Sequence, residues 1–166
     1  MGRDRNFQSF VAGFCALAMA SLMGSGFALA EDAAKACDRA AFSSTVTATG
    51  VSLNGLNDAN KKTFQEKLLK LKAKEGWPDS LYITQAAHFV KDEQIAVYDA
   101  TGAVLMTQIS QLSSGDAASD EKRCAMLADL KKYTDLLVAN AMSKWTYMHN
   151  KIDQALTSTV QAKAGQ

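Results

Sequence analysis

The spacing of apolar residues predicts a chain that is mostly helical. Between Ala59 and Glu75, apolar residues recur every three or four positions at Phe64, Leu68 and Leu71. Residues 76–78, Gly-Trp-Pro, are typical of a helix end. A shorter helix is expected after them, beginning at residue 79 or 80 and running to about residue 90.

The carboxyl-terminal part of the chain predicts one long helix, from about 117 to 162, because this range contains no proline or glycine. Its apolar residues advance mostly in steps of three or four: Leu127, Leu130, Leu137, Ala141, Trp145, Met148, Ile152, Leu156 and Val160. Such a helix would be about 65 to 70 Å long, more than a compact domain of this size needs. We therefore expect either a break near 140–144 or packing of part of the helix on a partner.

Two segments have the composition of β-strands. Residues 94–98 and 103–109 are rich in β-branched and aromatic residues, and Asp99-Ala100-Thr101-Gly102 between them suits a hairpin loop. Residues 43–53, in which threonine alternates with valine and alanine, are also strand-like. The predicted fold class is α+β and predominantly helical: helices, one β-hairpin at about 94–109 and the long helix at about 117–162.

The run from Ile95 to Leu105 resembles the hairpin of Cache and PAS-like extracytoplasmic sensor domains, with a hydrophobic strand, an aspartate, a turn glycine and a second hydrophobic strand. In those families the hairpin belongs to a larger antiparallel sheet that encloses a small-molecule pocket. The resemblance covers only residues 95–105. It implies a ligand-binding domain but transfers no binding residues.

The first 30 residues have the organisation of an export signal. Basic residues near the start precede an apolar stretch at 10–23, and small residues at Ala28 and Ala30 predict cleavage before Glu31. We therefore divide the chain into a signal peptide, 1–30, and one exported domain, 31–166, in the periplasm or secreted. Phe14 before Cys15 does not fit a lipoprotein signal, while an uncleaved membrane anchor stays open as the alternative.

Charge and cysteine content follow from this division. The full chain has 18 basic and 17 acidic residues, and removal of the signal leaves 16 of each. A neutral chain gives no electrostatic reason to expect binding to nucleic acid or to an anionic membrane. Cys15 is lost with the signal, so Cys37 and Cys124 remain, and in an oxidising compartment they predict a disulfide.

The sequence contains no recognised catalytic, metal-binding or covalent-haem motif. We therefore expect no enzyme activity, metal or cofactor, and interpret the two histidines as structural. Trp145, Met148 and Ile152 form an apolar patch on the long helix that is either core or a partner contact. The functional hypothesis is a non-enzymatic exported protein that acts by contact with another envelope protein or with itself. The alternative is an extracytoplasmic domain that binds a small ligand.

Overall fold

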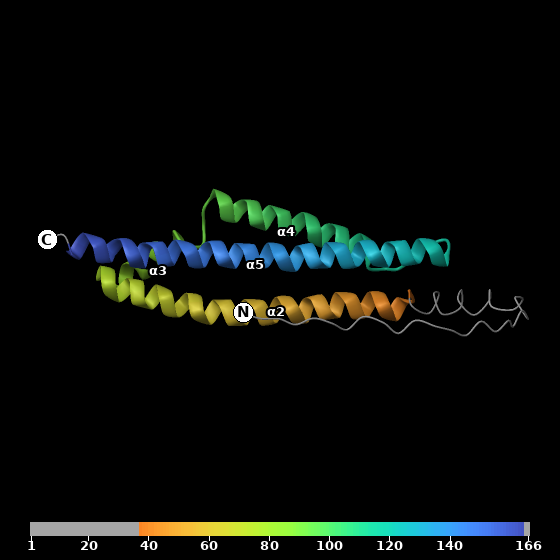
Figure 1. Ribbon diagram of the computed structural model, residues 1–166, viewed down its shortest axis with the longest axis horizontal. Helices are drawn as coiled ribbons and strands as arrows, with labels where there is room; N and C mark the ends of the chain where they lie inside the picture. Colours follow the sequence, from red (N-terminus) through yellow and green to blue (C-terminus); the bar gives the residue numbers. More distant parts are fainter. Residues whose placement is uncertain (1–36, 165–166) are drawn as a thin grey trace, which may run out of the picture.

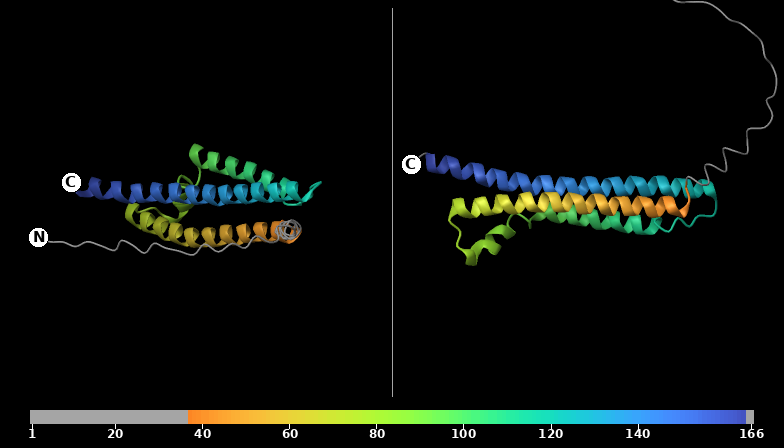
Figure 2. Two further views of the ribbon diagram at one scale, coloured as in Figure 1. Left: turned by 45° about the vertical axis from the view of Figure 1, so that its right-hand side comes forward. Right: turned by 90° about the horizontal axis from the view of Figure 1, so that it is seen from below.

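The computed structural model describes residues 37–164 and, within this range, contains four helices and no β-strand. The helices are α2 (Arg39–Glu75), α3 (Asp79–Ala87), α4 (Glu93–Leu112) and α5 (Asp120–Ala164). α5 lies between α2 and α4, as Figure 1 shows, and α2 runs in the same direction as α5 while α4 runs in the opposite direction. The left view of Figure 2 shows the same order, whereas the right view, from below, shows α2 and α4 on the same side of α5 and α3 at the end where α2 finishes.

α2 is a helix of 37 residues that includes the segment 43–53, where the sequence predicts a strand, so this prediction is wrong. It begins at an N-cap, Asp38, whose carboxylate accepts a hydrogen bond from the amide of Ala41 at 2.9 Å. The threonines fit the helix because their hydroxyls donate to carbonyls one turn back, from Thr45 to Ala41 and from Thr49 to Thr45. The end at residues 76–78 is confirmed, with Gly76 in the left-handed conformation at φ 69°.

α4 replaces the predicted hairpin at 94–109, which is therefore also wrong. Asp92 caps the helix by accepting a hydrogen bond from the amide of Ile95 at 2.8 Å. Ile95, Leu105 and Ile109 are buried, and their spacing places them on one face toward α5. Gly102 lies within the helix, where a Cβ atom would be 3.4 Å from Nδ2 of Asn140, so this glycine permits close packing and makes no turn.

α5 is continuous over 45 residues, without a break at 140–144. Its length is accounted for within the molecule because α2, a helix of 37 residues, packs along it. Excess helix length is therefore not an argument for a partner. Residues 113–119 connect α4 to α5, and the left-handed Gly115 in this loop lies against the ring of Phe42.

The buried apolar residues form two clusters along α5. The cluster near the start of α5 consists of Phe42, Leu105, Ile109, Leu127, Leu130 and Leu137. The cluster toward its end consists of Phe64, Leu68, Ile95, Met148 and Ile152, with Tyr82 and Ala86 of α3 packed against it. Both clusters draw residues from α2, α4 and α5, so the three long helices share one interior.

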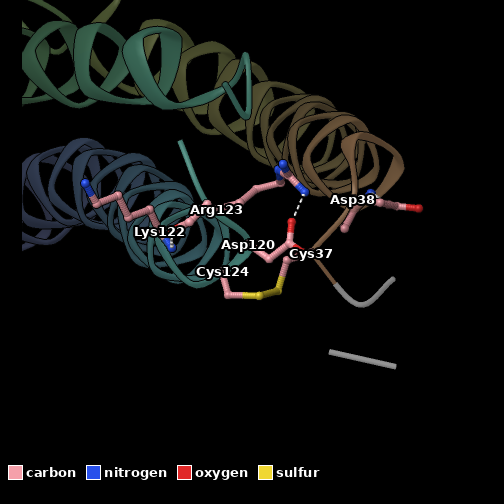
Figure 3. Close-up of a disulfide and its surroundings, with 8 residues drawn as sticks. Cys37, Asp38, Asp120, Lys122, Arg123 and Cys124 are labelled. Carbon is pink, nitrogen blue, oxygen red and sulfur yellow. Dashed lines mark hydrogen bonds and ion pairs between the residues drawn. A yellow bond between two sulfur atoms is a disulfide. The ribbon is translucent and has the colours of Figure 1, made fainter. Parts of the chain in front are cut away.

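The disulfide expected from the cysteine content is present between Cys37 and Cys124, with the sulfur atoms 1.99 Å apart. Cys37 directly precedes α2, and Cys124 lies in the first turns of α5, so the bond joins the starts of two parallel helices (Figure 3). Beside it, the guanidinium of Arg123 contacts the carboxylate of Asp120 at 2.7 Å. The bond thus fixes the end of the bundle that contains Phe42.

Candidate functional site

The most distinctive surface of the described chain is one without charge, near the disulfide. Residues 40–57 of α2 contain no charged residue, and neither do residues 100–115 of α4 and the loop after it. Charged residues make up 21% of the whole chain, so two such runs on neighbouring helices are unusual, although Lys131 and Asp135 of α5 line the groove beside residues 41–52. We refer to the surface formed by residues 40–57 and 100–115 as the charge-free surface.

The two halves of the charge-free surface meet over α5. A narrow cleft of about 100 Å³ lies between them, lined by Val46, Thr49, Gly50 and Leu53 of α2, by Met106 and Ile109 of α4, and by Thr134 and Leu137 of α5. Phe42 of α2 and Ile109 of α4 also belong to the same buried cluster. The uncharged runs are therefore adjacent in space although residues 58–99 separate them in the sequence.

Large apolar side chains are exposed on this surface. Val51 is 68% exposed, Val104 61% and Met106 54%. An ion pair between Arg39 and Asp116, 2.7 Å apart and well exposed, marks its edge at the disulfide end. Depletion of charge together with exposed apolar side chains is a feature of the centre of protein–protein interfaces.

The remaining parts of α2 and α4, outside the charge-free surface, carry charged residues. Ion pairs link Lys67 to Asp153 and Lys72 to Asp79, and Lys144 of α5 contacts Asp99 at the start of α4. These pairs are partly exposed, so each contributes little to stability. α2 and α4 therefore each have a charged part and an uncharged part, whereas α5 carries charged residues beside the charge-free surface, among them Lys131 and Asp135.

The predicted patch at Trp145, Met148 and Ile152 lies mostly in the interior. Met148 is 5% exposed and Ile152 0%, and both pack in the cluster toward the end of α5. Trp145 is half-buried, and its indole Nε1 donates to Oδ1 of Asn57 on α2 at 2.9 Å. In this fold Met148 and Ile152 contact the chain itself, and only Trp145 reaches the surface.

His149 belongs to an aromatic group between α2 and α5. The ring of Phe64 packs edge-on against the rings of Trp145 and His149, with centroids 5.9 and 5.8 Å away. Nε2 of His149 lies 3.2 Å from Oδ1 of Asn60, whereas the buried Nδ1 has no hydrogen-bond partner among residues 37–164. Burial lowers the pKa of His149, Lys67 acts in the same direction, and Asp153 opposes them.

Asp92 is the most connected carboxylate at the start of α4. It caps the helix, accepts a hydrogen bond from the hydroxyl of Tyr147 at 3.0 Å and pairs with Lys151, whose ammonium also donates to the carbonyl of His88 at 2.6 Å. The bond to Lys151 and the cap lower the pKa of Asp92, and the bond from Tyr147 raises the pKa of that phenol. These contacts hold the start of α4 on α5.

The remaining predicted residues are placed as follows. Cys37 and Cys124 are bonded to each other, while Ala28, Ala30 and Glu31 of the predicted cleavage site lie outside the described residues. Among residues 37–164, no group of three or more His, Cys, Asp and Glu side chains is arranged to hold a metal ion.

The charge-free surface was missed by the sequence reasoning, although the two uncharged runs can be read directly from the sequence. Its signal is the absence of charge at solvent-facing positions of a helix. The expected hairpin and strand concealed this signal, since alternating side chains do not define an outer helix face.

Within the described range, no helix combines the length and apolar character needed to cross a bilayer. Comparison of the chain with protein-family models, with curated proteins and with solved structures found no match.

Proposed function

We propose that the protein is a non-enzymatic exported protein that acts by protein–protein contact, and that a second copy of the chain binds at the charge-free surface. The single observation that supports this proposal is the pairing of two uncharged helix faces, 40–57 and 100–115, with apolar side chains exposed on both. Such a surface can face a copy of itself without like-charge repulsion and without the cost of removing ions from water.

The proposal is tested by light scattering on the exported chain after size-exclusion chromatography, across about a hundredfold range of concentration. We expect a mass that rises from monomer to dimer with concentration, because binding follows mass action. Val51→Lys and Val104→Lys each place a cation on the charge-free surface, and both are expected to shift the equilibrium to monomer. A monomer at every concentration would contradict self-association.

Leu69→Lys provides the matched control. Leu69 is also on α2 and 54% exposed, but it lies in the charged part of that helix, next to Lys70. The substitution adds the same charge to the same helix without touching the charge-free surface. If Leu69→Lys disrupts the dimer as strongly as Val51→Lys, the contact is not at the charge-free surface.

Export is a separate part of the proposal, supported by the pattern of residues 1–30. It is tested by mass spectrometry of the protein recovered outside the cytoplasm. We expect a chain that begins at Glu31 and is two hydrogens lighter than its reduced form. A mass that retains residues 1–30 would support the membrane-anchored alternative.

A further inference from the structure

The interior of the bundle changes character between its two apolar clusters. At this level Asn57 of α2, Gly102 of α4 and Ala141 of α5 line a cavity of about 340 Å³. Toward either end of the bundle from this cavity, large apolar residues such as Leu137 and Ile152 occupy the inward positions. Small or amide side chains thus line a pocket between the two apolar clusters, which is partly open to solvent because Asn57 and Asp99 are exposed.

Two asparagines in the cavity wall each use one half of the amide to join neighbouring helices. Oδ1 of Asn57 accepts from the indole of Trp145 at 2.9 Å, and Nδ2 of Asn140 donates to the carbonyl of Tyr98 at 2.9 Å. Among the described residues, no other hydrogen bond uses Nδ2 of Asn57 or Oδ1 of Asn140. One donor and one acceptor on the wall are therefore available to another molecule.

An ion pair contributes a second donor and a second acceptor. The ammonium of Lys144 contacts the carboxylate of Asp99, and both side chains line the same cavity. They remain 31% and 61% exposed, so a ligand entering from solvent can reach them. Trp145, Met148 and Val90 add apolar wall next to these polar groups.

We propose that this cavity binds a free α-amino acid with an apolar side chain. Lys144 and Asn57 supply donors for its carboxylate, Asp99 and Asn140 supply acceptors for its ammonium, and Trp145 contacts its side chain. A volume of about 340 Å³ is at the small end of the range for ligand sites, which suits a molecule of this size. The inference is independent of the proposed self-association, which uses a different surface.

Isothermal titration of the exported chain tests this assignment with L-leucine, L-methionine and L-phenylalanine as ligands. We expect saturable binding of at least one of them. L-leucinamide lacks the carboxylate of leucine, and 4-methylpentanoate lacks its ammonium. We expect each analogue to bind at least about tenfold more weakly than leucine, because a charged group and its hydrogen bonds to the protein are lost. If another of the three amino acids is the one that binds, its own amide and its own deaminated analogue are used instead. No binding of the three amino acids, or equal binding of the analogues, would overturn the proposal.

Substitutions locate the site. Ala141→Leu fills the cavity, whereas Ala139→Leu adds the same side chain at an exposed position of α5 outside it. We expect at least about a tenfold loss of affinity for the first and no change for the second, with helicity checked by circular dichroism. Lys144→Met removes the ammonium that would bind the carboxylate of the amino acid. Because Lys144 is partly exposed, this variant replaces Ala141→Leu in the test if Ala141→Leu does not fold. Unchanged affinity in the folded cavity variants would place binding elsewhere and refute the assignment.

Discussion

Loss of the disulfide should lower the stability of the fold by an amount that can be worked from its position. Cys37 and Cys124 are 87 residues apart in the sequence. In the chain-entropy model, closing a loop of this length destabilises the unfolded chain by about 4.6 kcal/mol relative to the open chain. Small domains have a free energy of unfolding of about 5–15 kcal/mol, so the reduced protein should be weakly stable.

The native contacts near the bond should survive its loss, because Phe42 remains buried with Leu127 and Leu130 between α2 and α5. The double variant Cys37→Ala/Cys124→Ala should therefore keep its helical circular dichroism in buffer. In urea, a slope of about 1.5 kcal/mol per molar converts about 4.6 kcal/mol into a midpoint lower by about 3 M. The slope itself should rise, because the unfolded chain is more expanded without the cross-link.

Reductant supplies the internal control. Dithiothreitol should reproduce the lower midpoint in the wild-type chain and have no effect on the double variant. A difference below about 1 kcal/mol between the oxidised chain and the double variant would refute the reasoning, because it would mean that the bond restricts little of the unfolded ensemble.

Three further predictions concern single residues. Because burial and Lys67 lower the pKa of His149 below its ordinary 6.5, the unfolded chain takes up a proton first as the pH falls, so stability is lost on acidification below about pH 6.5. The thermal midpoint should fall more between pH 7 and pH 5 in the wild type than in His149→Gln, and equal falls would contradict this. Ile152→Ala should cost about 2–5 kcal/mol in urea unfolding because Ile152 is fully buried, whereas Ile83→Ala, at a residue 75% exposed, should cost less than about 0.5 kcal/mol. Gly76 and Gly115 both have positive φ, but only at Gly115 would a Cβ atom meet another group, the Phe42 ring at 3.1 Å. Gly76→Ala should cost about 1–2 kcal/mol and Gly115→Ala measurably more, and equal costs would mean that the ring yields freely.

The helices that could be predicted from sequence are those whose buried residues are large and regularly spaced. Phe64, Leu68 and Leu71 mark the second half of α2, and α5 was predicted to within a few residues of its ends. The disulfide could also be predicted, because only two cysteines remain after the predicted cleavage site. In these cases burial and spacing indicate the same structure.

α4 and the first half of α2 could not be predicted in this way because their local preferences oppose their tertiary environment. Threonine, valine and glycine favour other structures, whereas packing against α5 selects the helix. Ile95, Leu105 and Ile109 do follow helical spacing, so counting apolar positions in α4 would have corrected the hairpin. The charge-free surface depends on these two segments and was therefore missed with them.

The weak helix preference of residues 40–57 also connects the disulfide to the proposed contact. α2 has four buried residues, and only Phe42 lies in the charge-free half, while Phe64, Leu68 and Leu71 anchor the other half. The cross-link at Cys37 holds the end of the segment that has the fewest apolar anchors.

We therefore expect reduction to loosen residues 40–57 before the bundle unfolds as a whole. Amide hydrogen exchange in these residues should accelerate more than in residues 60–75, and the dimer should weaken in parallel. Uniform acceleration along α2 would contradict this, because it would mean that the helix opens as one unit and that the bond stabilises both halves equally.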